Sequence, residues 1–279
     1  MKKKATYMML FDLEPSAEEY LELVRDWKDP NPDPVLEEHE GIIVVRDDLL
    51  KYGSKIRSID YLIGHDPSYS HVKEWVFGGC PRYGYAQISL PYVCNQYGKK
   101  SVLFMAGKAN AGDGIPPIKL HEYQQKGIDL GADYRWLNFG MLSNTKARAK
   151  DYYDESPETR ALLPLGLEHP TVMASMIKVA RNLPVKPKEI WSVGSSGTLS
   201  RSLQLAFPEA DVHVVSVGHK MKDREIGRAK YYRSELAFNK AVKKEDEPPF
   251  PSAPTYDAKA WKFVRQYASK GALFWNVGA

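Results

Sequence analysis

The chain has 279 residues, of which 43% are hydrophobic and 27% are charged, a globular composition that excludes an intrinsically disordered protein. Its 39 lysines and arginines outnumber its 35 aspartates and glutamates by only four, so a polyanionic partner is permitted but not required. No apolar run reaches the roughly 18 residues of a membrane-spanning helix, so no membrane partner is expected. Two cysteines without metal-ligand spacing favour a reducing, cytoplasmic setting and predict no metal site.

Strands and helices are predicted to alternate along most of the chain. Residues 5–11 are interpreted as a strand or an ordered N-terminal arm, and prolines at every second position of 29–34 predict an extended turn. Strands are expected at 41–45, 74–77, 101–105, 133–137, 189–193, 212–217 and 272–275. Helices are expected at 16–27, 47–63, 86–97, 118–126, 170–181, 197–207 and 258–269. This alternation indicates parallel βαβ units and an α/β fold.

The segment from residue 191 to 198 predicts an anion site. A strand runs through a turn of small residues directly into a helix; these residues are Gly194, Ser195, Ser196, Gly197 and Thr198. Such a turn directs backbone N–H groups and the positive end of the helix dipole at one point. The segment has neither the lysine of a P-loop nor the spacing of a dinucleotide fingerprint. Taken alone, it is equally consistent with an ordinary strand-to-helix turn capped by serine.

A second segment carries a family resemblance. Residues 45–50 (VRDDLL) and 53–62 (GSKIRSIDYL) resemble the lysine segment of 1-aminocyclopropane-1-carboxylate deaminases and D-cysteine desulfhydrases. These are fold type II, or tryptophan-synthase-β-like, enzymes that use pyridoxal 5′-phosphate (PLP). The resemblance places Lys55 on the lysine that forms a Schiff base with PLP, and residues 194–198 on the phosphate loop. Without the resemblance, Lys55 would be taken for a surface lysine on a helix.

Three further segments match the family in the same order along the chain: 164–166, 256–260 and 274–278. The resemblance implies two α/β domains with mainly parallel sheets and the cofactor in the cleft between them. It implies a large domain of residues 1–67 and 146–279 and a small domain of residues 68–145. It also implies a homodimer.

The resemblance assigns roles to residues near the C-terminus. Asp257 stands where the deaminases carry a glutamate that bonds the pyridine nitrogen, and a carboxylate there strengthens the ring as an electron sink. The alternative is that Asp257 only caps the helix that begins near Ala258. Tyr256 is expected to be a neighbouring acid–base or stacking group.

The turn at residues 79–85 departs from the family pattern. The family usually has a serine and an asparagine there, which help to hold the substrate carboxylate, and this chain has lost both. A site that no longer clamps the carboxylate can permit decarboxylation. Arg82 is expected to pair with a carboxylate or phosphate, or else to be a solvent-exposed loop residue. Tyr83 and Tyr85 are expected to stack on a ring or to pack, and Cys80 to be a small packed residue.

Residues 219–244 are basic, with nine lysines and arginines against three acids and with two tyrosines among them. We predict a helical tendency here. A basic face with aromatic residues suits a nucleic-acid backbone, and a solvated helix face is the alternative.

The sequence thus predicts a PLP-dependent lyase that forms a carbanion at Cα of an amino-acid group, with catalytic residues Lys55, Tyr256, Arg82 and Tyr83. The departures from the family resemble phage enzymes that hypermodify thymine, and decarboxylation of an amino acid attached to thymine in DNA is the leading hypothesis. The alternatives are elimination or deamination of a free small amino acid, and a non-catalytic protein that binds PLP or nucleic acid.

Overall fold

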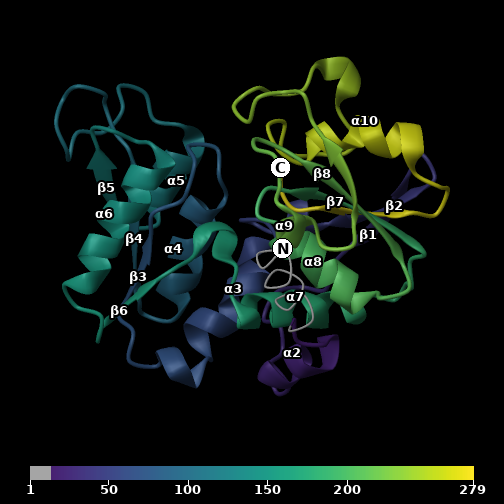
Figure 1. Ribbon diagram of the computed structural model, residues 1–279, viewed down its shortest axis with the longest axis horizontal. Coiled ribbons are helices and arrows are strands. Elements are labelled where there is room, and N and C mark those ends of the chain that lie inside the picture. The colour runs from purple at the N-terminus through teal and green to yellow at the C-terminus, as the bar shows by residue number, and fades with distance from the viewer. Residues whose placement is uncertain (1–13) are drawn as a thin grey trace, which may run out of the picture.

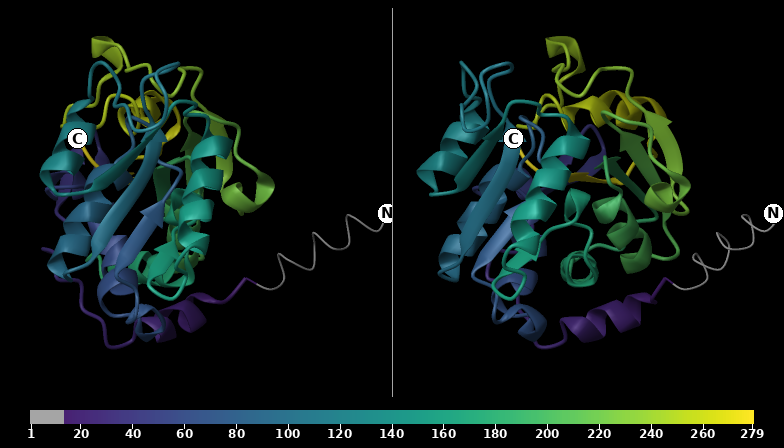
Figure 2. Two further views of the ribbon diagram at one scale, coloured as in Figure 1. Left: turned by 90° about the vertical axis from the view of Figure 1, so that its left-hand side faces the viewer. Right: turned by 60° about the vertical axis from the view of Figure 1, so that its left-hand side comes forward.

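A computed structural model describes residues 14–279 of the chain. Two β-sheets form two lobes that stand side by side (Figure 1), and Figure 2 shows the same lobes turned by 60° and by 90°. The predicted strand or arm at residues 5–11 lies outside the described residues. None of the helices in the described part combines the length and apolarity needed to cross a membrane.

The larger lobe is built on a six-stranded sheet with the order β1-β2-β10-β7-β8-β9. All neighbouring strands are parallel except β1 and β2. The strands are β1 (Leu36–His39), β2 (Ile42–Arg46), β7 (Glu189–Gly194), β8 (Asp211–Ser216), β9 (Lys230–Arg233) and β10 (Leu273–Asn276). The helices are α2 (Ala17–Leu23), α7 (Pro170–Arg181), α8 (Thr198–Ala206), the short α9 (Asp223–Ile226) and α10 (Ala258–Tyr267).

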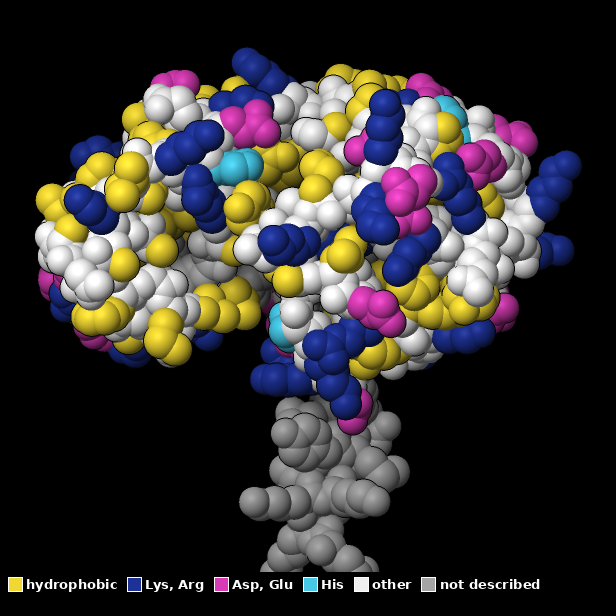
Figure 3. Space-filling view, turned by 90° about the horizontal axis from the view of Figure 1, so that it is seen from above, with side chains coloured by type: hydrophobic (Ala, Val, Ile, Leu, Met, Phe, Trp, Pro, Cys, Tyr) yellow, Lys and Arg dark blue, Asp and Glu magenta, His cyan; other side chains and the backbone are white. Residues whose placement is uncertain are grey.

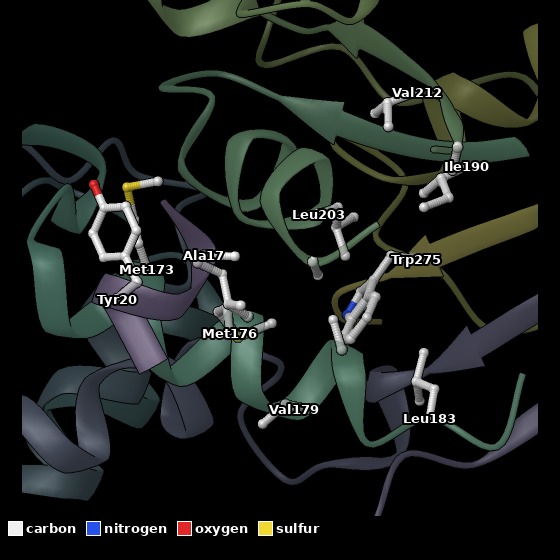
Figure 4. Close-up of a cluster of buried hydrophobic side chains, with 14 of the residues drawn as sticks. Ala17, Tyr20, Met173, Met176, Val179, Leu183, Ile190, Leu203, Val212 and Trp275 are labelled. Carbon is white, nitrogen blue, oxygen red and sulfur yellow. The ribbon is translucent and has the colours of Figure 1, made fainter. Parts of the chain in front are cut away.

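Alternating side chains give this sheet two buried faces. Ile190 and Trp275 pack with α2, α7 and α8 in one apolar cluster (Figure 4), whereas Trp191 and Phe274 pack with α10 in another. Because strand side chains alternate between faces, consecutive apolar residues in β7 and β10 serve both clusters. The predicted interior strands are continuous apolar runs for this reason.

The smaller lobe has a parallel four-stranded sheet with the order β5-β4-β3-β6. Its strands are β3 (Glu74–Phe77), β4 (Lys100–Ala106), β5 (Asp133–Leu137) and β6 (Arg160–Leu162). The helices α3 (Lys55–Gly64), α4 (Ala86–Gln96) and α5 (Glu122–Asp129) supply apolar side chains to one cluster, and α6 (Leu142–Asp154) covers the other face. Helix α3 also contacts α7, so it lies between the lobes.

The predicted α/β architecture with mainly parallel sheets is confirmed, with corrections in detail. Strand β6 pairs with β3, although it lies beyond residue 145, the predicted end of the small domain. We therefore propose a domain boundary after β6. The sequence pattern also missed β1, α6 and β9.

The predicted helical tendency of residues 219–244 is wrong for most of the segment. Apart from α9 and a single 3₁₀ turn that begins at Lys244, the segment forms loops and the strand β9. Strand β9 exists because it pairs with β8, with Val215 opposite Tyr232. A solvated helix face is thus excluded as the explanation of its basic residues.

Candidate cofactor and substrate cleft

Lys55 is the first residue of α3. The predicted continuous helix over 47–63 is broken: a 3₁₀ turn at Asp47–Leu49 is followed by Gly53, whose φ is +72°. A Cβ on Gly53 would lie 2.5 Å from the carbonyl oxygen of Val277, so only glycine fits this close approach. The Ser54 N–H donates to the same oxygen at 2.9 Å. The break therefore turns Lys55 away from the end of β2 toward the space between the lobes.

A buried network fixes the segment that carries Lys55. The Asp47 carboxylate accepts hydrogen bonds from Ser54 Oγ at 2.7 Å, Arg57 Nε at 3.0 Å and Trp275 Nε1 at 3.0 Å. Burial raises the pKa of Asp47, and the charge of Arg57 and these hydrogen bonds oppose the shift. Because buried polar groups need partners, this network ties β10 to the start of α3. Sequence reasoning did not identify it.

The loop at 194–198 has the geometry of an anion cradle. Gly194 ends β7, Gly197 has φ +80°, and α8 begins at Thr198. Within residues 14–279, the backbone N–H groups of Ser195, Ser196 and Gly197 donate to no protein acceptor. The first N–H groups of α8 also lack intrahelical partners, as at every helix start. The loop thus offers free donors at the positive end of a helix dipole.

Lys55 and this loop face the same space. Two adjoining hollows both have Lys55, Gly166, Ser195, Ser196, Tyr256 and Val277 in their walls. The larger hollow has a volume of about 740 Å³ when the open solvent at its mouth is included. We call the two hollows together the cleft; Figure 3 shows the molecule from above, with lysine and arginine side chains on both lobes.

The cleft alters the acid–base properties of Lys55. Burial lowers the pKa of its amine, and the nearby acidic side chain of Asp257 partly opposes this shift. A lysine with a lowered pKa holds more of the neutral amine, which is the form that attacks an aldehyde. This behaviour agrees with the role expected for Lys55.

Asp257 is buried without a partner. Its side chain makes no cap hydrogen bond to α10, although it precedes that helix directly, so the alternative N-cap role is excluded. Neither carboxylate oxygen has a hydrogen-bond partner in the described chain, and the residue is fully buried. Burial raises the pKa of Asp257 well above the ordinary value; the nearby Val277 N–H, which does not reach hydrogen-bond geometry, and the charge of Lys55 oppose the shift. Burying a carboxylate without a partner costs free energy. A bound group that brings a cation or an N–H donor to Asp257 would offset this cost.

The turn at 79–85 forms the small-lobe wall of the cleft. Cys80, Tyr83 and Tyr85 line it, together with Tyr256 from the large lobe. Arg82 does not: it is exposed, and its guanidinium donates to the Lys119 carbonyl at 2.7 Å. This contact does not favour the expected pairing of Arg82 with a substrate anion, because a loop carbonyl engages the same side chain. The alternative of an exposed loop arginine agrees with its position.

Several lining residues were not identified from the sequence. Phe77 and Leu165 lie within predicted segments, 74–77 and 164–166, although neither residue was assigned to the site. His219 and Phe238 lie in the basic stretch at 219–244, for which a nucleic-acid contact or a solvated helix face was predicted. Among residues 14–279, no arginine, aspartate or glutamate lines the cleft. Lys55 and His219 are its only basic side chains in that range.

The comparisons with known proteins agree with this geometry. No family model matches the chain. The glycyl-dTMP PLP-dependent decarboxylase of Pseudomonas phage M6 is 26% identical over 218 residues, covering 68% of this chain and 77% of that protein. An ACC deaminase homologue superposes with a TM-score of 0.73 and 15% identity over 95% of both chains.

Two other solved structures are similar. Threonine deaminase isoform 2 from Solanum lycopersicum gives a TM-score of 0.66 at 12% identity, over 94% of this chain and 84% of that one. Diaminopropionate ammonia lyase from Escherichia coli gives 0.62 at 11% identity, over 94% and 87%. The resemblance predicted from the sequence is thus confirmed: this chain has the fold of the type II PLP-dependent enzymes, and pyridoxal phosphate is its expected cofactor.

Proposed function

We propose that the chain is a PLP-dependent lyase that removes carbon dioxide from an amino-acid group attached to a thymine nucleotide. One observation carries the proposal. The cleft joins a lysine of lowered pKa and a loop of free N–H donors, and none of the described residues that line it is an arginine. The unpartnered carboxylate of Asp257 is buried behind the cleft wall, near enough to Lys55 to affect the pKa of its amine. The sequence similarity to a phage glycyl-dTMP decarboxylase supports the choice of substrate.

The residues present fit the cofactor. Lys55 would hold its aldehyde carbon, and the N–H groups of 195–197 with the hydroxyls of Ser196 and Thr198 would hold its phosphate. Asp257 would face its pyridine nitrogen, which supplies the donor that the carboxylate lacks. When bound, PLP supplies an electron-accepting ring conjugated to the substrate amino group. Tyr256 borders the same space and would flank that ring.

The small-lobe wall favours loss of the carboxylate. A carboxylate that enters beside Cys80, Pro81 and Tyr83 loses water and meets no guanidinium. Departure as neutral CO₂ relieves that desolvation. The bond from Cα to the carboxyl carbon breaks and its electron pair stays with Cα. Lys55, once its amine has taken up a proton from solvent, would donate that proton to Cα.

Elimination of ammonia from a free small amino acid is the second candidate. The similarity to solved structures of threonine deaminase and diaminopropionate ammonia lyase favours it. Such a substrate would have to hold its carboxylate on hydroxyl and backbone groups alone. The two candidates differ in the mass that the substrate loses.

Contact with DNA through residues 219–244 is part of the proposal. Lys222 and Arg224 line a groove, together with Lys146, that shares Phe77, Gly79, Leu165 and Ser196 with the cleft. Glu168 and Glu225 also line this groove, and Arg224 pairs with Glu168 at 2.9 Å. Phosphates bound there would make the affinity fall steeply with salt. A homodimer acting in the cytoplasm completes the proposal, and sedimentation would measure the oligomeric state.

The test is a mass measurement. The holoenzyme is incubated with thymine nucleotides and DNA that carry an amino acid on the base, and with free amino acids. Loss of carbon dioxide from the base-linked substrate, absent in Lys55→Ala, is the expected result. Loss of ammonia from a free amino acid without any decarboxylation would overturn the proposal in favour of the second candidate.

A further inference from the structure

The mouth of the cleft is bordered by aromatic rings from both lobes. Tyr83 belongs to the small-lobe turn, and Phe238 belongs to the loop after β9 of the large lobe. Both side chains are partly exposed, and both line the same hollow as Lys55. Aromatic side chains that stay partly exposed at a pocket mouth offer stacking surface to a planar ligand.

Each ring is held from behind. The Tyr83 ring packs edge-on against His121 at 4.8 Å between centroids, and His121 packs against Tyr123 at 4.7 Å. On the other lobe, Phe238 contacts Tyr256 edge-on at 6.3 Å and lies over Gly218. A Cβ on Gly218 would come within 3.1 Å of the Phe238 ring, so a glycine there leaves room for it. Packing within the small lobe thus positions the Tyr83 ring, and packing within the large lobe positions the Phe238 ring.

A buried lysine fixes the loop that carries Phe238. Lys259 is 1% exposed, and its amine donates to the carbonyl oxygens of Ala237 at 2.8 Å and Phe238 at 3.2 Å. The same amine lies 5.8 Å from the Phe238 ring centroid. Because a buried ammonium must be satisfied, these two carbonyls are held where Lys259 can reach them. Lys259 therefore acts as a positioning residue for Phe238.

We infer that Tyr83 and Phe238 form a two-sided stacking clamp for the pyrimidine ring of the substrate, which makes them its specificity-determining residues. This inference rests on the proposed function: if the substrate carries a thymine base, these two rings are the residues that recognise it. Among the described residues, no arginine, aspartate or glutamate lines the cleft, which agrees with a ligand that is recognised by its flat face. Stacking of this kind accepts a base that has left the DNA stack and equally a free nucleotide.

The clamp is tested by binding, independently of catalysis. Thymidine 5′-monophosphate, which carries no amino acid, is titrated into the holoenzyme of Phe238→Ala and Tyr83→Ala. Each substitution should weaken binding by roughly 5- to 150-fold, the range for loss of one base–aromatic stack. Phe238→Tyr and Tyr83→Phe keep the ring and should bind like wild type. Phe139→Ala, which removes an exposed aromatic ring outside the cleft walls, should have no effect.

The role of Lys259 is tested separately, by nucleotide binding in a double-mutant experiment. Lys259→Met should weaken nucleotide binding in the wild-type background but not in Phe238→Ala, because its effect passes through that ring. A merely structural role would weaken binding equally in both backgrounds. Cofactor absorbance reports whether each variant still forms the holoenzyme. Phe238→Leu or Tyr83→Leu replaces the alanine variant at the same position if that variant does not.

The clamp and the proposed function fail in different ways. Unchanged nucleotide binding in both alanine variants overturns the clamp, even if base-linked substrate is decarboxylated. Weakened binding in both alanine variants with no carbon dioxide released from any substrate supports the clamp and overturns the decarboxylase. In an active enzyme, Phe238→Ala should raise KM for the base-linked substrate by a larger factor than it lowers kcat.

Discussion

The two walls of the cleft differ in what they are made of. The large-lobe wall at 194–198 offers backbone N–H groups from a glycine–serine turn, whereas the small-lobe wall at 79–85 offers cysteine, proline and tyrosine side chains. The first wall follows the family pattern, and the second departs from it. Backbone donors depend on turn geometry and suit a constant group such as a phosphate. Side chains can change without moving the backbone, so we expect substrate choice to depend on lining side chains such as Tyr83 and Phe238 rather than on the loop at 194–198.

The substitution with the largest expected effect on turnover is Lys55→Ala, which tests whether Lys55 is the reaction centre between the two walls. Lys55→Ala should lower turnover by at least about 10²–10⁴-fold, the usual range for loss of a proton-transferring side chain. Lysine-bound PLP should also disappear from the visible absorbance spectrum. Lys51→Ala, an exposed lysine four residues earlier, is the matched control and should be unaffected. Equal loss in both variants would contradict a special role for Lys55.

The next effect is confined to the backbone wall. Gly197→Ala places a Cβ against the Glu225 backbone and forces a left-handed conformation that costs about 1–2 kcal/mol. We expect the variant to lose PLP, as measured by dialysis and absorbance. Gly98→Ala is the control, since Gly98 also has a positive φ but no atom within 4 Å of an added Cβ. Retention of PLP by Gly197→Ala would argue against this loop as the phosphate site.

Asp257 gives a smaller effect that depends on pH. Its pKa is raised in the folded protein, so its contribution to the stability of the cofactor-free protein is present below its unfolded pKa and is lost as pH rises toward the folded pKa. Asp257→Asn should remove this slope of about 1.4 kcal/mol per pH unit while lowering activity. Urea unfolding at several pH values measures it. Asp211 is an exposed carboxylate on β8, and Asp211→Asn should leave the pH slope of the unfolding free energy in place. If the two variants show the same pH slope, burial of Asp257 has little effect on stability.

The smallest effect belongs to the side-chain wall. Burial raises the pKa of the Cys80 thiol to about 12, with the backbone of Gln87 and the charge of Lys55 opposing the shift. The thiol is therefore protonated near neutral pH and is a poor nucleophile. Cys80→Ala should keep kcat within a few-fold of wild type. A loss as large as that of Lys55→Ala would give Cys80 a chemical role that this geometry does not predict.

The alternation of strands and helices, the glycine–serine turn and the lysine segment could all be predicted from local patterns in the amino-acid sequence. These features are encoded within a few neighbouring residues, by side-chain periodicity and by the φ angles that glycine allows. The helix α7 matches its predicted range, 170–181, for this reason. The position of Lys55 at the break after Gly53 was not predicted, because the clash that requires glycine comes from Val277, more than two hundred residues away.

Which side chains meet in the cleft could not be predicted from local sequence patterns, because it depends on contacts between distant residues. The pairing of β9 with β8 positions the loop after β9, from which Phe238 lines the cleft, while Arg82 donates to the Lys119 carbonyl and does not line it. The missing partner of Asp257 is likewise invisible in sequence, because it depends on which distant groups surround a buried carboxylate. Local patterns fix the elements and their order, whereas contacts between residues far apart in the chain fix the chemistry of the space that the elements enclose.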